Sequence, residues 1–143
     1  MTSLFFDTNA LIYWLNARDE RHDEVDRLIG RAIERGVALH TGACQLNEVY
    51  YVTSRHHFGE SVARALLADI AEVFSLASLD EGIVRDALGS DEPDYEDGLV
   101  RAMAEHLAVD ALVSYDEGAF KRSSVPKVTA REALELEGLA DGT

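Results

Sequence analysis

Short apolar stretches alternate with amphipathic segments along the whole of this chain, and this alternation is what most restricts its fold. The clearest amphipathic segment runs from His22 to Gly36, where apolar residues recur every three or four positions and a glycine supplies a C-terminal stop. Strands that alternate with helices through short connections build a parallel sheet covered by helices on both faces. The sequence therefore predicts an α/β fold.

The pattern places the elements as follows. Strands are expected over residues 3–6, 37–40, 73–79, 111–114 and 126–129. Helical segments are expected over residues 10–14, 22–36, 44–57, 60–72, 80–88 and 95–106. The 143 residues contain no internal repeat and no Pro/Gly/Ser-rich linker, so we expect a single domain over residues 1–137 and a flexible tail over 138–143.

Composition narrows the class of protein. The single cysteine, Cys44, cannot form an internal disulfide, which favours a reducing compartment. Neither a signal-peptide pattern nor a run of 18 apolar residues is present, so we expect a soluble cytoplasmic protein without a membrane segment. The 13 basic and 27 acidic side chains give a net charge of −14, which argues against binding nucleic acid by general electrostatics alone.

Several of the acidic residues fall where elements begin or end. Asp7 and Asp116 follow two predicted strands, and carboxyl ends of parallel strands meet at one edge of a sheet, where ligands bind. Glu48 interrupts an otherwise apolar helical segment, and Asp94 and Asp97 lie three residues apart at the start of another helix. Carboxylates gathered in this way would repel one another without a cation. Mg²⁺ and Mn²⁺ prefer such oxygen ligands.

Four stretches resemble the PIN-domain family, and within it the VapC-type ribonuclease toxins of toxin–antitoxin pairs. They are FDTNALI (6–12), LNEVYYV (46–52), PDYEDGLVRAMAEHLAVDALVSYDEGAF (93–120) and VPKVTAREAL (125–134). The resemblance implies a PIN-like α/β/α sandwich with a central, mainly parallel sheet of four to five strands. It also implies a Mg²⁺- or Mn²⁺-dependent endoribonuclease that acts on RNA, is restrained by a cognate antitoxin and forms a homodimer.

The resemblance carries roles to individual residues. Asp7, Asp97 and Asp116 correspond to the acids that hold the ion, and Glu48 to the glutamate that completes the catalytic pocket. The residues expected to hydrogen-bond the acids, water or phosphate are Thr8, Asn9 and Ser114, with Asp94 as an auxiliary acid. The sequence departs from the family at Gly98, which takes an alanine-like position, and at Tyr115, which replaces a frequent basic or Asn residue.

Each acid also has an ordinary structural explanation. Asp7 and Asp94 could cap helices, Glu48 could be an exposed helix residue, and Asp116 could form a turn before Gly118. Four such coincidences at the family's positions and in its order are less probable than one metal pocket.

Two other functions stay open. A PIN-like protein could act mainly by binding its partner, with little nuclease activity. A phosphatase of the haloacid dehalogenase type also begins with an Asp after its first strand, but it needs a second Asp two residues later, where this chain has Asn9. It also needs a later lysine near an acidic loop, which the sequence does not place. The neighbouring His56 and His57 do not share a helix face, which argues against a joint metal site.

Overall fold

The computed structural model describes residues 1–140, and its centre is a five-stranded sheet in the order β3-β2-β1-β4-β5. All four neighbouring pairs are parallel. The strands are β1 (Ser3–Phe6), β2 (Ala38–Gly42), β3 (Ser75–Ala77), β4 (Ala111–Val113) and β5 (Lys127–Val128). Because the chain starts in the middle strand, the ends of β1 and β4 lie side by side although about a hundred residues separate them.

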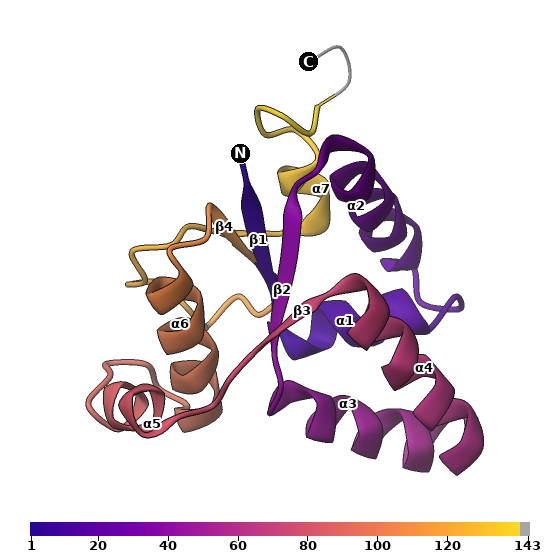
Figure 1. Cartoon of the computed structure of the whole chain (residues 1–143), viewed down its shortest axis with the longest axis horizontal. Coiled ribbons are helices and arrows are strands. Elements are labelled where there is room, and N and C mark those ends of the chain that lie inside the picture. The colour runs from indigo at the N-terminus through magenta and orange to yellow at the C-terminus, as the bar shows by residue number, and fades with distance from the viewer. Residues whose placement is uncertain (141–143) are drawn as a thin grey trace.

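Helices connect the strands and cover both faces of the sheet (Figure 1). They are α1 (Thr8–Leu15), α2 (His22–Arg35), α3 (Gln45–Val52), the π-helical turn η1 (Thr53–His57), α4 (Glu60–Val73), α5 (Glu81–Leu88), α6 (Tyr95–Leu107) and α7 (Ala130–Ala133). Helices α5 and α6 lie on one side of the sheet, and α1 to α4 with α7 lie on the other (Figure 1). The predicted α/β/α sandwich around a central parallel sheet of four to five strands is confirmed.

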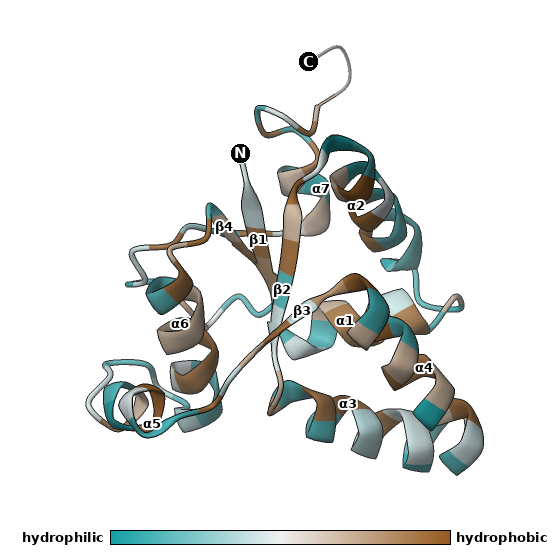
Figure 2. Cartoon of the chain, in the orientation of Figure 1, coloured by the Kyte–Doolittle hydropathy of each residue, from teal (hydrophilic) through white to brown (hydrophobic). Residues whose placement is uncertain are grey.

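Strand β1 divides the core. Leu4 and Phe6 belong to a cluster shared with α1, α2 and α7, whereas Phe5 belongs to a second cluster shared with α5 and α6. All three side chains are fully buried. Successive strand side chains point to opposite faces, so a strand buried on both faces reads as an unbroken apolar run. Figure 2 shows this as hydrophobic colour on the strands and hydrophilic colour toward the outside of the helices.

The observed elements follow the predicted ones with local differences. The helix expected over 44–57 divides into α3 and the π-helical turn η1. The division falls at Thr53, whose hydroxyl donates to the Val49 carbonyl at 2.7 Å, a contact with the preceding turn that often bends helices. Helix α7 was not predicted; it begins with a capping box in which Thr129 and Glu132 each accept from the other's backbone N–H.

The C-terminal segment packs against α2. Leu139 is fully buried, and its carbonyl accepts a 2.6 Å hydrogen bond from Arg31. Arg35 donates to the carbonyls of Gly138 and Ala140. These residues are the first part of the expected tail, and its remainder, 141–143, lies outside the described residues. Within residues 1–140, no helix combines the length and the apolar character needed to cross a membrane.

Candidate active site

The predicted acids come together at the carboxyl edge of the sheet. Asp7 follows β1, Asp116 follows β4, Glu48 comes from α3 and Asp97 from α6. They share a pocket of ≈ 740 Å³ lined by Asp7, Thr8, Asn9, Cys44, Gln45, Asn47, Glu48, Tyr51, Asp94, Tyr95, Glu96, Asp97, Leu99, Val100 and Asp116. Seven of the eight residues singled out from the sequence therefore line one cavity, and the eighth, Ser114, lies beneath it at 1% exposure.

Asp7 is the most buried acid of the pocket, at 6% exposure. One carboxylate oxygen accepts the backbone N–H of Thr8 at 2.8 Å, which makes Asp7 the N-cap of α1. The other accepts the hydroxyl of Ser114 at 2.9 Å. Burial raises the pKa of Asp7, and these two hydrogen bonds oppose that effect because they stabilise the charged form. Capping a helix and lining the pocket are thus two roles of the same carboxylate.

Ser114 connects Asp7 to Asp116. Its hydroxyl oxygen accepts the backbone N–H of Asp116 at 3.1 Å, while its proton is donated to Asp7. Asp116 also forms a turn, since one of its carboxylate oxygens accepts the N–H of Gly118 at 2.9 Å. Lys127 donates to the main-chain carbonyl of Asp116 at 2.5 Å, and its charge lowers the pKa of Asp7. Hydrogen bonds with Ser114, Gly118 and Lys127 therefore fix the loop after β4 around Asp116.

Helix α6 brings in the third acid. Asp94 is its N-cap and accepts the backbone N–H of Asp97 at 3.1 Å, as the capping explanation predicted. Burial, followed by the negative charges of Asp7, Asp94 and Asp116, raises the pKa of Asp97 from 3.8 to about 7. A carboxyl group with such a pKa lies in a field that favours a cation or a proton.

Glu48 projects from α3 at the open side of the pocket. Its pKa is raised mainly by desolvation, and the negative charges of Glu96, Asp7 and Asp94 add smaller increases. Glu96 was not selected from the sequence as a site residue, although it lies between Asp94 and Asp97 at the start of α6. Its position in an acidic run at a helix N-terminus was the available signal, and only the packing of α6 against the pocket shows that it contributes charge there.

Gln45 was also missed from the sequence. It is 4% exposed, and its amide nitrogen donates to the Phe6 carbonyl at 3.1 Å and contacts the Thr8 hydroxyl at 3.3 Å. The hydroxyl of Thr41 donates to the same carbonyl at 2.9 Å. These contacts fix the start of α3 against the end of β1, which holds Glu48 on the same side as Asp7.

The chemistry of the donor set suits a hydrated divalent ion. In the described chain no three His, Cys, Asp or Glu side chains are close enough to hold a metal by themselves. Mg²⁺ commonly uses one or two carboxylates and keeps several waters. The buried Oδ1 of Asn9, beside Asp7, has no hydrogen-bond partner and can accept from such a water. The residues therefore fit an ion held partly through water.

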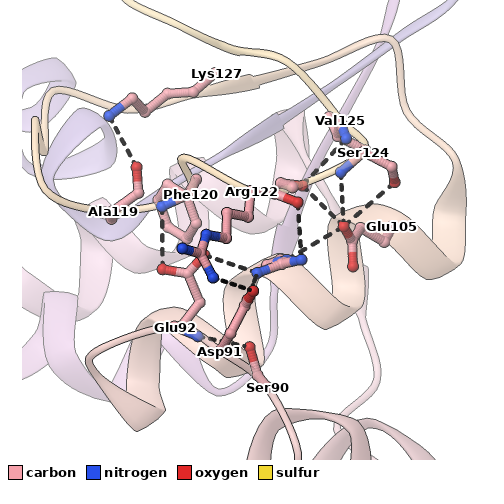
Figure 3. Close-up of polar contacts among 12 residues, drawn as sticks. Ser90, Asp91, Glu92, Glu105, Ala119, Phe120, Arg122, Ser124, Val125 and Lys127 are labelled. Carbon is pink, nitrogen blue, oxygen red and sulfur yellow. Dashed lines mark hydrogen bonds and ion pairs between the residues drawn. The ribbon is translucent and has the colours of Figure 1, made fainter.

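A second polar cluster fixes the segments before α6 and after β4 (Figure 3). Arg101 of α6 pairs with Asp91 at 2.5 Å, Glu92 at 3.2 Å and Glu105 at 3.2 Å. The Glu92 side chain is only 3% exposed, and it also accepts the backbone N–H of Phe120 at 3.1 Å. This cluster ties the chain that leads to Asp97 to the loop that carries Asp116, outside the pocket itself.

Tyr115, noted as a departure from the family pattern, points away from the pocket. Its hydroxyl donates to Glu24 of α2 at 2.5 Å, and its ring packs edge-on against Tyr13 with 5.2 Å between centroids. Burial and the Glu24 hydrogen bond raise the pKa of this phenol. It joins the segment after β4 to α1 and α2.

Comparison with known proteins gives a family match and a structural match. The family model of the PIN domain matches residues 3–118. No curated protein matches the chain. The crystal structure of VapC20 from Mycobacterium tuberculosis, a toxin that cleaves the sarcin–ricin loop, superposes with a TM-score of 0.66 at 20% identity. The match covers 79% of this chain and 89% of VapC20, and at this identity it establishes similarity of fold.

Proposed function

Because the chain belongs to the PIN-domain family, we propose that it is a divalent-metal-dependent endoribonuclease of the VapC type. One observation carries the proposal: Asp7, Glu48, Asp97 and Asp116, from four separate segments, line one pocket. The same pocket raises the pKa of Asp97 to about 7, first through burial and then through the negative charges of the neighbouring carboxylates.

Each acid has a role that follows from its surroundings. Asp7, Asp97 and Asp116 would hold Mg²⁺ or Mn²⁺, directly or through water. The bound ion would lower the pKa of a water and neutralise charge on the phosphate. Glu48, at the open side of the pocket and with a raised pKa, is placed to orient the attacking water and accept its proton.

The neutral polar residues support these acids. Ser114 and the N–H of Thr8 fix both oxygens of Asp7, so its orientation does not depend on the ion. Asn9 offers an acceptor to a water in the pocket. Asp94 holds the first turn of α6 through the Asp97 N–H and adds negative charge near Glu48.

The partners follow from the same proposal. A ribonuclease active in the cytoplasm needs an inhibitor, and a pocket with six acidic residues would accept a basic antitoxin segment. We therefore expect a cognate antitoxin, and the resemblance to the VapC-type toxins adds the expectation of a homodimer. VapC20 cleaves the sarcin–ricin loop, but at 20% identity that substrate is not assigned to this chain.

The direct test is cleavage of a labelled RNA with EDTA, Mg²⁺ or Mn²⁺. We expect metal-dependent internal cleavage by the parent protein and loss of it in Asp7→Asn. Asp69→Asn, which removes a charge from an exposed position on α4, is the matched control and should cleave normally. Cleavage that persists in EDTA, or equal cleavage by Asp7→Asn, would refute the proposal.

The partner-binding alternative is favoured by one observation, the absence within residues 1–140 of three acids close enough to hold an ion unaided. It predicts no RNA cleavage and no effect of Mn²⁺ on the melting temperature. The phosphatase alternative lacks support, because the family model that matches is that of the PIN domain. A lysine, Lys127, does lie beside Asp116, so the residue that argues against phosphatase chemistry is Asn9.

A further inference from the structure

One wall of the acidic pocket ends in an exposed aromatic side chain, against which an arginine and a histidine pack. Tyr51 lines the pocket and is 53% exposed. The guanidinium of Arg55 lies over its ring, 5.3 Å from the centroid. The His56 ring packs edge-on against the same ring, 5.6 Å between centroids. We call these three residues the Tyr51 platform.

The π-helical turn creates this arrangement. In an α-helix, residue i+4 lies on the face of residue i, but residue i+5 has moved to another face. The turn η1 spans Thr53–His57 and widens the helix there, so both Arg55 and His56 contact Tyr51. His57 turns instead toward Phe58, with 5.6 Å between ring centroids. Single π-turns of this kind often occur at functional sites.

Charge makes the platform unusual in this protein. No Arg, Lys or His side chain is among the residues that line the acidic pocket. Other arginines are engaged by acids, for example Arg64 with Glu60 and Arg85 with Glu81. Arg55 forms no ion pair within residues 1–140, and the contact that the structure gives it is the Tyr51 ring. Its positive charge therefore remains available to an anion at the rim of the pocket.

We infer that the Tyr51 platform binds single-stranded RNA next to the acidic pocket, with a base on the Tyr51 ring and a phosphate at Arg55 and His56. This inference rests on the proposed function and names the residues that hold its substrate. Aromatic rings stack unpaired bases, and arginines add charge and cation–π contacts. It also explains how a protein of net charge −14 could retain RNA: local positive charge lies where the pocket opens.

The test measures RNA binding and cleavage separately. Binding of a fluorescein-labelled single-stranded RNA of mixed sequence is followed by anisotropy in the Asp7→Asn background, in which the RNA should stay intact. We expect Tyr51→Ala to weaken binding about tenfold, within the range for loss of one stacked base, and Tyr51→Phe to bind within about twofold of the parent. Arg55→Gln should reduce the slope of log K against log salt by about 0.7, the value for one phosphate contact on a single strand.

A matched control and a kinetic readout distinguish the platform from a general effect of charge or folding. Arg27→Gln makes the same charge change on an exposed position of α2 and should leave binding unchanged. In the otherwise unmodified enzyme, Tyr51→Ala and Arg55→Gln should raise KM with little change in kcat, since the contact is made equally before and during reaction.

The outcomes separate the two proposals. If the unmodified protein cleaves RNA but the platform variants bind RNA as tightly as Arg27→Gln, the platform inference is wrong and the proposed function stands. That result would leave the platform as a surface for a protein partner instead. If the unmodified protein neither cleaves nor binds RNA with Mg²⁺ or Mn²⁺, the proposed function fails and the inference fails with it.

Discussion

The hydroxyl of Ser114 donates a 2.9 Å hydrogen bond to Oδ2 of Asp7, across 107 positions of sequence. Strands β1 and β4 are neighbours in the sheet, with Phe6 paired to Val113, so the residues that follow each strand meet at the carboxyl edge. Both partners are buried. The bond therefore fixes the most buried acid of the pocket before any ion or substrate arrives.

Replacing Ser114 should weaken both the fold and the site. Ser114→Ala leaves one oxygen of the buried Asp7 carboxylate without its donor, which costs about 1–3 kcal/mol for a hydrogen bond to a buried charged group. We expect the urea midpoint of unfolding to fall at neutral pH and RNA cleavage to drop about tenfold, because Asp7 loses its orientation. Ser114→Thr keeps the hydroxyl and should recover most of both.

Ser54 provides the control for that experiment. Its buried hydroxyl has no hydrogen-bond partner, so Ser54→Ala removes the same atom without breaking a bond. Equal losses of stability in the Ser54 and Ser114 variants would show that the Asp7 bond contributes nothing.

The raised pKa of Asp97 should make the metal-free protein lose stability as the pH rises from about 4 to 7. The folded-state pKa of Asp97 is about 7 and its ordinary value is 3.8, so the folded protein binds this proton more tightly than the unfolded chain. The stability contributed by protonated Asp97 is fully present below pH 4 and is lost as the pH rises through 7. Asp7 and Glu48 have raised pKa values and contribute with the same sign.

Urea titrations in EDTA at several pH values would measure this slope. Asp97→Asn should flatten it, whereas Asp69→Asn on α4 should not. A slope that is the same in Asp97→Asn and in the parent would contradict the assignment of the raised pKa to Asp97.

Divalent ions should counteract the loss of stability at higher pH. An ion that binds only the folded protein stabilises it by about 2.7 kcal/mol at a concentration a hundredfold above its Kd. The ion competes with protons for Asp97, so the rise in melting temperature with Mn²⁺ should be larger at pH 7.5 than at pH 5.5. Thermal melts of the parent and of Asp7→Asn test this, and the shift should be lost in the variant. An equal shift in both proteins would place the ion elsewhere.

The ion-pair cluster around Arg101 should contribute more to the free energy of unfolding than the exposed ion pairs do. Arg101→Met would leave Glu92, whose side chain is 3% exposed, without its cation, and breaking a buried pair in this way costs about 3–5 kcal/mol. The pair of Arg85 and Glu81 is exposed on α5, so Arg85→Met should cost below about 1 kcal/mol. Urea unfolding of the two variants compares them.

The double variant Arg101→Met, Glu92→Gln distinguishes an unpaired charge from lost packing. Neutralising the unpaired Glu92 carboxylate should restore part of the stability lost in Arg101→Met. If the double variant is less stable than Arg101→Met, the contact between Glu92 and the Phe120 backbone is the stronger contribution.

The sequence by itself determined the class of fold and the chemical character of the site. The apolar runs at residues 4–6 and 111–113 specified buried strands because burial on both faces requires an unbroken apolar stretch. Asp7 and Asp116 stood out because a parallel sheet brings the residues after such strands to one edge. These are local properties, carried by residue type and spacing.

Tertiary structure alone decided the contacts. That Ser114 bonds Asp7, that Glu96 adds its charge to the pocket and that Lys127 reaches the Asp116 carbonyl depend on strand order and helix packing, which spacing along the chain does not encode. The π-helical turn that places Arg55 and His56 on Tyr51 likewise arises where α3 ends in a hydroxyl contact with the preceding turn. Residue type supplied the acids, and three-dimensional packing set their burial and their distances from one another, and therefore their pKa values.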